Sequence, residues 1–268
     1  MSLVPCVLTI GGSDSSGGAG IQADLKTFVA HQVHGLSVVT GVTAQNTTGV
    51  VRAAVMESEL VTAQIDAVAD DMAIAAGKTG LLFNAVIIEA AADAVRKHSI
   101  ENLVVDPVLV DKRDQPIVDE AAVELYRHQL LPLCRLTTPN LREAEILSGV
   151  EIDDLDSAQH AAHAIHDIGN SAVLIKGGRW KESPGTDIYF NGTAIEVLSA
   201  KTRGLPKAYG TGCTLSASIA ANLAKGLDLF ESVQSAKEYV GQCLARTQKP
   251  GQGQPLLHAP GEGAYLVP

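Results

Sequence analysis

The stretch CVLTIGG, residues 6–12, decides the fold class. Its first five residues form a short apolar run with no polar face, and two glycines end the run. Such a run is typical of a strand buried on both sides, as in a parallel sheet covered by helices on both faces. We therefore predict a strand over residues 6–10. In sheets of this kind ligands bind beyond the carboxyl ends of the strands, so the residues after each strand are the candidates for a site.

The rest of the chain alternates between short apolar strands and amphipathic helices. The predicted strands are residues 6–10, 36–43, 50–56, 73–78, 103–106, 172–175, 187–190 and 194–198. The predicted helices are residues 19–33, 59–72, 85–97, 119–131, 140–147, 157–168, 214–225 and 229–246. This alternation predicts βαβ units, a mostly parallel sheet and an α/β fold. The length of 268 residues fits one domain, residues 1–268.

Local signals define several element ends. Asp156 or Ser157 is expected to cap the helix that follows it, and Gly226 stands where glycine is favoured beyond a helix end. Asn191-Gly192 predicts a hairpin between two strands. The glycine- and proline-rich tail, residues 249–268, is expected to lie over the surface.

Composition and charge exclude several classes of partner. The formal net charge is −10 and the isoelectric point is near 5.2, so no broad cationic face for nucleic acid or anionic membrane is expected. The four cysteines show no CxxC pair, which favours a reducing compartment. No basic, apolar leader begins the sequence, and no apolar run reaches the roughly 18 residues that span a bilayer. We therefore expect a cytoplasmic protein.

Two phosphate-binding patterns match only in part. Gly77-Lys78-Thr79 resembles the end of a P-loop, but Met72 stands where the first glycine belongs, so the end of a strand is the better interpretation.

The second partial match is to the dinucleotide fingerprint. Gly18-Ala19-Gly20 with Ala23 follows the first strand too late, and no acidic residue lies about 20 positions further on. Five histidines are expected on helices at the surface and show no zinc-binding spacing: residues 31, 34, 160, 163 and 166.

The strongest local signal is GTGCT, residues 210–214, which precedes a predicted helix. Gly210 and Gly212 let the backbone approach an anion, and the amide groups of the first helical turn favour negative charge there. A helix with a glycine-rich entrance and no ligand is the alternative. Cys213 lies at the start of the helix, where the pKa of a thiol is lowered, so it is a candidate general base. A buried structural cysteine is again the alternative.

A second glycine-rich segment, GGSDSSGGAG, follows the first predicted strand at residues 11–20. It predicts either a tight loop that meets a ligand or a flexible loop. Asp24 follows it near the positive end of the first helix.

Three further strand ends carry polar groups. Asp106 ends the predicted strand at residues 103–106, Asn140 and Glu143 share a helical face after residues 136–139, and Lys176 follows residues 172–175. Each of these polar groups alone is more typical of a surface residue than of a functional site. Together they supply carboxylates for hydrated magnesium, a lysine for phosphate, an anion-binding loop and a base, which are the parts that phosphoryl transfer requires.

At this point the sequence resembles a known family along nearly its whole length. The segments that carry the resemblance are LTIGGSDSSGGAGIQADLKTF (8–28), VTAQNT (42–47), VDPV (105–108), TPNLREAEILSG (138–149), IKGG (175–178) and GTGCTLSASIAANLAKG (210–226). The chain is similar to the hydroxymethylpyrimidine kinase/phosphomethylpyrimidine kinase family of thiamine biosynthesis, within the ribokinase-like superfamily. The resemblance implies a three-layer fold with a small β flap, and residues 42–55 are the candidate for the flap. It also implies a homodimer.

The resemblance implies that ATP and Mg²⁺ are used to phosphorylate 4-amino-5-hydroxymethyl-2-methylpyrimidine and then its monophosphate. Gln45 matches the residue that binds the aminopyrimidine. The implied catalytic residues are Cys213, Lys176, Gly210 and Gly212. The implied substrate-binding residues are Gly11, Asp24, Gln45, Leu81 and Val108. Lys176, Asn140, Glu143 and Thr211 are implied for the nucleotide, and Asp106 and Glu143, through water, for the metal.

The sequence departs from the family pattern at three places. Ala208-Tyr209 replaces Thr-His, Arg179 stands where His is frequent, and Leu81 replaces Met. A pyridoxal or pyridoxine kinase of the same fold therefore stays open as an alternative. So does a pyrimidine-binding regulatory protein without activity. A dehydrogenase is the third alternative.

Overall fold

Strand β1 (Cys6–Asp14) lies within the sheet, parallel to its neighbours β2 (His34–Gln45) and β4 (Ile74–Thr79). In the computed structural model the described residues are 4–111, 113–169, 171–178, 180, 184–199 and 206–259. Within these residues the sheet has nine strands in the order β3-β2-β1-β4-β5-β6-β7-β8-β9. The other strands are β3 (Val50–Val55), β5 (Leu103–Val105), β6 (Leu136–Thr137), β7 (Ala172–Ile175), β8 (Asp187–Phe190) and β9 (Ile195–Leu198).

The sheet is parallel from β2 to β7 and antiparallel only at its two edges. At one edge β3 pairs with β2 and forms the small β flap, and at the other β8 and β9 form a hairpin. The prediction of a mostly parallel α/β sheet with a small flap is confirmed. Because β2 and β4–β7 run parallel to β1, all of their carboxyl ends lie along one edge of the sheet.

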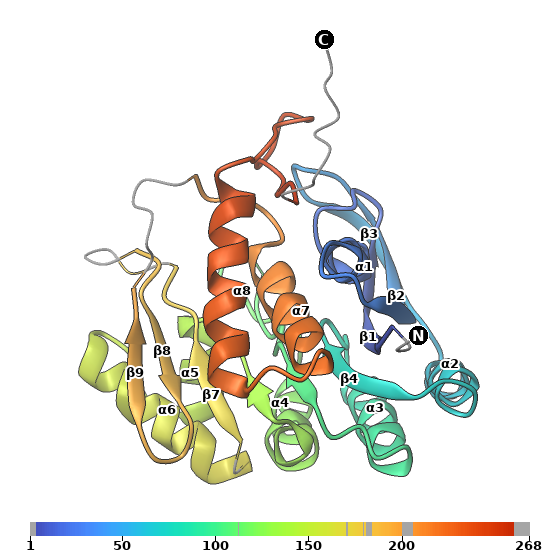
Figure 1. Ribbon diagram of the computed structural model, residues 1–268, viewed down its shortest axis with the longest axis horizontal. Coiled ribbons are helices and arrows are strands. Elements are labelled where there is room, and N and C mark those ends of the chain that lie inside the picture. The colour runs from blue at the N-terminus through green and yellow to red at the C-terminus, as the bar shows by residue number, and fades with distance from the viewer. Residues whose placement is uncertain are drawn as a thin grey trace.

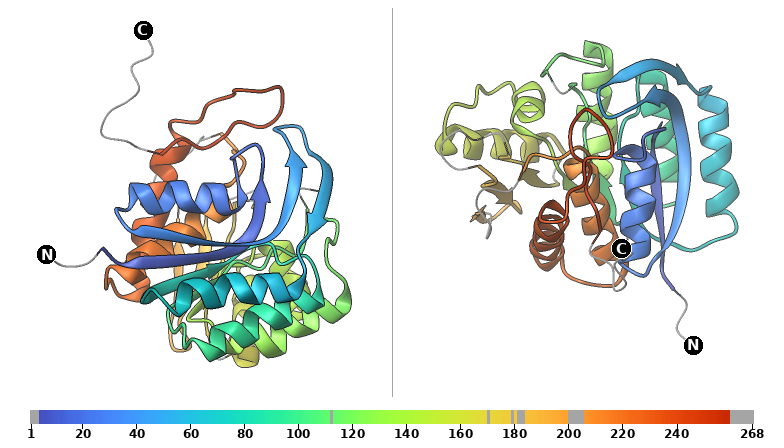
Figure 2. Two further views of the ribbon diagram at one scale, coloured as in Figure 1. Left: turned by 90° about the vertical axis from the view of Figure 1, so that its right-hand side faces the viewer. Right: turned by 90° about the horizontal axis from the view of Figure 1, so that it is seen from above.

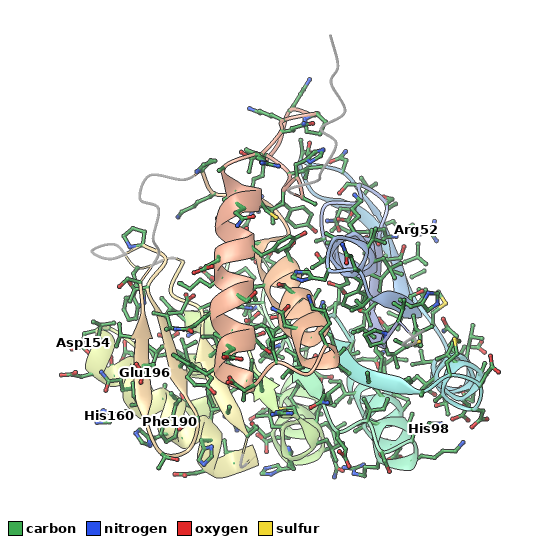
Figure 3. The ribbon with its side chains drawn as sticks, viewed as in Figure 1. Arg52, His98, Asp154, His160, Phe190 and Glu196 are labelled. Atoms are coloured by element: carbon green, nitrogen blue, oxygen red, sulfur yellow. The ribbon has the colours of Figure 1, made fainter. Side chains whose placement is uncertain are left out.

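Helices cover both faces of the sheet. The helices are α1 (Gly20–Ala30), α2 (Ser58–Ala69), α3 (Ala85–Lys97), α4 (Glu120–Leu125), α5 (Leu141–Ser148), α6 (Leu155–Gly169), α7 (Thr211–Ala224) and α8 (Leu229–Leu244). Helices α1, α7 and α8 pack together on the face turned to the viewer in Figure 1, and α2, α3 and α6 pack on the other. Figure 2 shows the sheet between these two layers. Strand β3 stays uncovered, and Arg52 projects from this edge in Figure 3.

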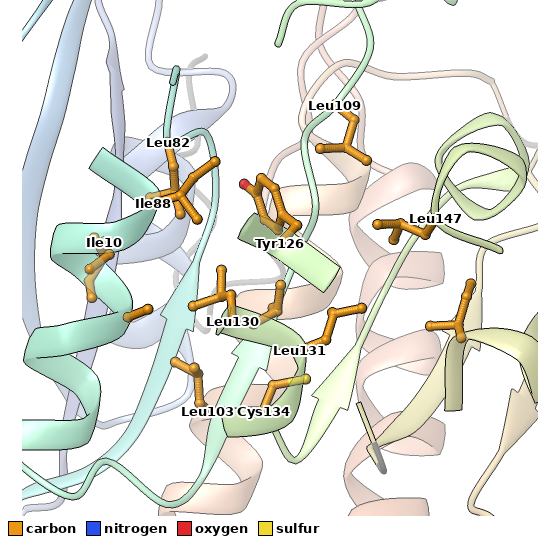
Figure 4. Packing of buried hydrophobic residues seen from close by; sticks show 14 of the residues in the cluster. Ile10, Leu82, Ile88, Leu103, Leu109, Tyr126, Leu130, Leu131, Cys134 and Leu147 are labelled. Carbon is orange, nitrogen blue, oxygen red and sulfur yellow. The ribbon is translucent and has the colours of Figure 1, made fainter. Parts of the chain in front are cut away.

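Tyr126 is the largest fully buried side chain of the core. Figure 4 shows its ring between Leu82 and Leu109, above Leu130 and Leu131. Its hydroxyl group donates to the carbonyl of Gly80 at 3.4 Å, directly after β4. Burial raises the pKa of the Tyr126 phenol, and the nearby carboxylates of Asp106 and Glu143 raise it further. The core thus extends to the edge where the strands end.

Two predicted boundaries near glycines are wrong. Strand β1 continues to Asp14, so Gly11 and Gly12 lie in the strand and not in a loop. They pair with Val39 and Gly41, with a bulge between them. Helix α7 begins at Thr211 rather than residue 214, because the backbone of Gly212 is already helical. In both places the low propensity of glycine is overcome by the backbone hydrogen bonds of the element.

The predicted helix over residues 119–131 is also corrected. It is α-helical only over Glu120–Leu125, continues as a π turn over Tyr126–Leu130 and tightens to a 3₁₀ turn over Leu131–Leu133. Pro132 lacks the amide proton that a regular turn would use, which favours this change. The predicted caps Asp156 and Ser157 are wrong as well. Asp154 accepts from the amide of Ser157, so α6 begins at Leu155.

The expectation that all five histidines lie on helices at the surface is wrong for three of them. His34 is exposed but begins β2, and His31 and His166 are half-buried. The ring Nε2 of His31 lies 2.8 Å from the Ser218 hydroxyl group, and burial lowers the pKa of His31 to about 4. The prediction is confirmed for His160 and His163, which are exposed on α6.

The turn predictions are confirmed at Gly226 and at the hairpin between β8 and β9. Gly226 has φ of 88°, and Gly192 in the hairpin loop has φ of 91°. Among the described helices, none combines the length and apolar character needed to cross a bilayer. All four cysteines are free thiols.

The described part of the tail lies against the flap. The segment Gln248–Leu256 pairs its own two ends and crosses the turn between β2 and β3 (Figure 2, left). The Gln254 amide donates to the Thr47 carbonyl at 3.2 Å, and the Gly253 amide donates to the Thr47 hydroxyl group at 3.1 Å. We call residues 248–256 the C-terminal strap.

Candidate active site

Lys176 and Asp106 meet at the edge where β5 and β7 end. The Lys176 Nζ lies 2.6 Å from Asp106 Oδ1, in a partly buried ion pair. The hydroxyl group of Thr138, after β6, donates to the same oxygen at 3.2 Å, and Ser216 of α7 donates to Oδ2 at 3.4 Å. Lys176 and Lys78 hold the pKa of Asp106 below its ordinary value, although burial opposes them. Two residues that the sequence placed on separate strands therefore form one charged centre.

The glycines of the GTGC loop have different roles in the structure. Gly210 has φ of 86°, and a Cβ there would lie 1.8 Å from the Gly18 carbonyl oxygen, so only glycine fits. A Cβ at Gly212 would lie 3.3 Å from Lys176 Nζ and 3.8 Å from Asp106 Oδ2. The backbone of Gly212 therefore faces the charged centre directly, at the first turn of α7.

Thr211 does not direct its hydroxyl group into this space. The Thr211 Oγ1 donates to the Ala208 carbonyl at 2.8 Å and closes the loop before α7. The residue predicted to contact the nucleotide thus has a structural hydrogen bond as well.

The prediction of a lowered Cys213 pKa is wrong. Burial raises the pKa of the thiol to about 11, and the carboxylates of Asp24 and Asp106 add to this effect. The Lys78 ammonium group acts in the opposite direction. The position in the first turn of α7 was predicted correctly, but the sequence showed neither the burial nor the two carboxylates.

Asn140 and Glu143 lie at the start of α5 and form a capping box. Asn140 Oδ1 accepts from the Glu143 amide at 3.0 Å, and Glu143 Oε2 accepts from the Asn140 amide at 2.8 Å. The pattern of Asn followed three residues later by Glu is a known signature of this motif. Burial raises the pKa of Glu143 to about 7, while Lys176 lowers it and Asp106 raises it further. Glu143 and Asp106 are therefore close enough for their charges to interact.

The loop after β7 is held from both sides. The Gly177 amide donates to Asp187 Oδ1 at 2.8 Å, and Lys237 of α8 pairs with the same carboxylate. Trp180 lies against Gly177, since a Cβ on that glycine would approach the indole Cδ1 to 2.1 Å. Lys176 therefore extends from a backbone that is fixed by neighbouring groups.

Arg179, one of the three residues that depart from the family pattern, lies outside the described residues.

Asp24 forms a buried ion pair beside the charged centre. Its oxygens lie 2.9 and 2.8 Å from Lys78 Nζ, and Thr9 donates to Oδ2 at 2.7 Å. Both side chains of the pair are 1% exposed. Gly77-Lys78-Thr79 lies in β4, as predicted. Lys78 is a site residue that the sequence analysis missed, and the signal was a lysine within an otherwise apolar strand.

Apolar side chains pack around glycines at the ends of β1, β2 and β4. A Cβ at Gly12 would lie 3.3 Å from the Phe83 ring and 3.6 Å from Leu81 Cδ2. Gly41 faces the same ring, where a Cβ would approach it to 2.5 Å. Phe83 has φ of 62°, a conformation that costs free energy in a bulky residue and is found most often at functional sites. Phe83 was missed because no sequence pattern marks a left-handed residue of this type.

The other predicted substrate residues lie at or just beyond the ends of the parallel strands. Gly11 lies in β1 beside Gly80, since a Cβ at Gly11 would lie 3.7 Å from the Gly80 Cα. Leu81 is half-buried after β4, and Val108 is half-buried after β5. Gln45 ends β2, and its Nε2 donates to the Tyr209 hydroxyl group.

The comparisons with known proteins agree with this geometry. Residues 14–258 match the protein family described as phosphomethylpyrimidine kinase. The chain is 45% identical over 260 residues to a hydroxymethylpyrimidine/phosphomethylpyrimidine kinase of Synechococcus elongatus, covering 95% of this chain and 97% of that protein. Among solved structures it is similar to an ADP complex of Bacillus subtilis pyridoxal kinase, with a TM-score of 0.89, 35% identity and coverage of 96% and 98%. It is also similar to a Clostridium difficile phosphomethylpyrimidine kinase, with a TM-score of 0.80, 36% identity and coverage of 89% and 98%.

Proposed function

The chain belongs to the phosphomethylpyrimidine kinase family, and from this premise we propose that it transfers the γ-phosphoryl group of ATP to a hydroxymethylpyrimidine and then to the monophosphate formed. The fold is ribokinase-like. The observation that carries the proposal is the meeting of Lys176, Asp106 and the first turn of α7 around Gly212. This places a cation and backbone amides around one space, where negative charge would develop on the transferred group.

Each part of this centre has a proposed role. Lys176 binds the phosphoryl group as a point charge, and the amides of residues 210–213 form the anion hole with the helix dipole behind them. Cys213 is proposed as the base that accepts the proton of the substrate hydroxyl group. Its raised pKa in the free protein makes the thiolate unfavourable until further positive charge is bound nearby. Asn140 and Thr211 support the loops that face the nucleotide.

The carboxylates fit a bound Mg²⁺ ion. The described residues hold no cluster of three or more side chains that could cage a metal by themselves. Mg²⁺ usually binds through one or two carboxylates, its own waters and substrate phosphates, which is what Asp106 and Glu143 can provide. Burial and the charge of Asp106 raise the pKa of Glu143, so a divalent cation would relieve the crowding of the two groups. The ion would supply neutralisation of the phosphate charge.

The acceptor is proposed to bind beside the apolar side chains at the ends of β1, β2 and β4. Gly11, Leu81 and Val108 would line the ring, and the Gln45 amide would bind its polar edge. Asp24, which is buried and paired with Lys78, is proposed to contribute to acceptor binding through this ion pair.

A pyridoxal kinase is the second candidate. The specific observation that favours it is the TM-score of 0.89 to the Bacillus subtilis pyridoxal kinase. The test is turnover with Mg²⁺ and ATP, in which hydroxymethylpyrimidine and pyridoxal are compared and the products are followed by mass. Formation of pyrimidine monophosphate and then diphosphate is expected. Pyridoxal phosphate alone would transfer the proposal to the second candidate, and no product would favour a regulatory binding protein.

Replacement of Cys213 by alanine is expected to separate the two steps. The first acceptor is a neutral alcohol that must lose a proton, whereas the second is already an anionic phosphate. Loss of a general base costs about 10²- to 10⁴-fold, so the first step should slow by that factor and the second far less. Single-turnover rates of both steps measure the difference. An equal loss in both would contradict the base assignment and leave Cys213 with a loop-shaping role.

Three broader properties stay predictions. The whole chain, residues 1–268, is proposed to act as one kinase domain, which the continuous sheet of the described residues supports. A cytoplasmic location is supported by the four free thiols. A homodimer is supported by the uncovered edge strand β3, where Val50, Val51 and Val55 are exposed.

A further inference from the structure

Gln45 is tied to Tyr209, a residue that lies 164 positions further along the chain. The backbone of Gln45 is fixed by Ser15, whose hydroxyl group donates to the Gln45 carbonyl at 2.7 Å and accepts from the Gln45 amide at 2.8 Å. The position of the side chain is then set by the Tyr209 hydroxyl group, which accepts from Nε2. Tyr209 directly precedes Gly210, so this contact joins the acceptor end of the site to the anion hole.

The direction of this hydrogen bond follows from a third residue. The Tyr209 hydroxyl group also bonds the Asp14 side chain. Asp14 is buried, and its carboxylate accepts from the Ala19 amide at 2.9 Å and the Ser16 amide at 2.8 Å. A carboxylate only accepts, so the single phenolic proton of Tyr209 points to Asp14 and the phenolic oxygen can only accept from Gln45. Burial and the charge of Asp14 raise the pKa of Tyr209, which keeps it a phenol.

The orientation of the Gln45 amide is therefore determined. One N–H of Nε2 is used by Tyr209, which leaves the second N–H and the oxygen Oε1 for a ligand. The Thr43 hydroxyl oxygen lies 3.2 Å from Gln45 Oε1. The same hydroxyl group donates to the Ser13 carbonyl at the shorter distance of 2.9 Å, so its proton points mainly to Ser13. The amide thus presents an acceptor beside a donor. An aminopyrimidine presents the complementary pair, an amino group beside a ring nitrogen, whereas a pyridoxal ring has no amino group.

Tyr209 is itself held in place by the C-terminal strap. The Tyr209 amide donates to the Pro255 carbonyl at 2.9 Å, and Tyr209 forms a parallel bridge with Leu256. Its ring lies against Gly18, where a Cβ would approach Cδ1 to 2.8 Å. Figure 2 (left) shows the strap beside the flap, in which Gln45 ends β2. The phenol is therefore fixed before a ligand arrives.

We propose that Tyr209 is a positioning residue that determines specificity, because it fixes the Gln45 amide in the orientation that binds an aminopyrimidine. This inference rests on the proposed function and adds a residue to its acceptor site. Without the hydroxyl group, the amide can flip over and present the same two groups in the opposite order.

The test compares Tyr209→Phe with the unchanged protein by calorimetry, using hydroxymethylpyrimidine and a nonhydrolysable ATP analogue separately. Loss of one oriented hydrogen bond is expected to weaken pyrimidine binding about 5- to 30-fold. Affinity for the ATP analogue is expected to stay unchanged, KM for the pyrimidine to rise by the same factor and kcat to stay within about twofold. Tyr239→Phe is the matched control, since it removes the hydroxyl group of a half-buried tyrosine on α8.

The outcomes separate the inference from the proposed function. Equal pyrimidine affinity in Tyr209→Phe and the unchanged protein would overturn the inference and leave the kinase proposal intact. A joint loss of pyrimidine affinity, nucleotide affinity and thermal stability would show a merely structural role and would also overturn it. If the unchanged protein binds no hydroxymethylpyrimidine, the acceptor proposed above is wrong and the inference fails with it.

Discussion

Replacement of Lys176 by alanine is expected to lower kcat for both phosphorylation steps by about 10²- to 10³-fold, the range found when one group that stabilises transition-state charge is removed. Both steps transfer the γ-phosphoryl group of ATP beside the same Lys176 ammonium group, so the rates of both steps should fall. Single-turnover rates with each acceptor measure the effect. The pyrimidine affinity should stay nearly unchanged, because Lys176 is proposed to act at the phosphate end of the site.

A loss of stability must be separated from this loss of rate. Asp106 loses its partner in Lys176→Ala, and its lowered pKa shows that the charged form is stabilised by Lys176 and Lys78. That contribution is present at neutral pH and is lost as the pH falls below the ordinary carboxyl pKa of about 4, so the destabilisation should shrink in acid. Urea unfolding of Lys176→Ala and the unchanged protein, at neutral pH and at a pH below about 4, checks this. Lys97→Ala, which removes an exposed lysine, is the control. A second step at the unaltered rate would refute the role of Lys176.

Replacement of Gly212 by alanine is expected to lower kcat for both steps by about 10²-fold or more without loss of stability. The new methyl group would occupy the space between the first turn of α7, Lys176 and Asp106. No backbone atom opposes it, since the nearest atom is the end of the Lys176 side chain, at 3.3 Å. Alanine also has a higher helix propensity than glycine, so the melting temperature should be unchanged or slightly higher.

The contrast with Gly210 makes this prediction specific. A Cβ at Gly210 would collide with the Gly18 carbonyl oxygen, and its φ of 86° disfavours alanine, so Gly210→Ala should lower both stability and activity. Thermal melting and turnover of the two variants, measured side by side, distinguish the effects. Full activity in Gly212→Ala would show that the phosphoryl group does not pass through this space.

Most of the fold followed from the sequence because its strands are short apolar runs between well-marked helices. The bounds of α3 and β7 were predicted to the residue, since Asn84 caps α3 and apolar residues alone form β7. The errors fall where tertiary contacts overrule local preference. Gly11 and Gly12 are drawn into β1 by pairing with β2, and Gly212 is helical because α7 continues through it.

The site could be predicted as a set of residues but not as an electrostatic environment. The positions after β5, β6 and β7 follow from topology, which is why Asp106, Asn140 and Lys176 converge as expected. The burial of a side chain and its partners from other strands do not follow from the spacing of residues in the sequence. For that reason the sequence indicated the wrong direction for the Cys213 pKa, and the Lys78–Asp24 pair was missed.

The loop after β7 gives this protein a built-in optical reporter. The sequence contains one tryptophan, and Trp180 packs on Gly177, next to the lysine that is proposed to bind phosphate. The indole emission of the whole chain therefore comes from a single place beside the reacting groups rather than being averaged over the fold. Nucleotide titrations can be followed by intrinsic fluorescence with no dye attached, and a change in emission without a change in melting would locate the event at this loop.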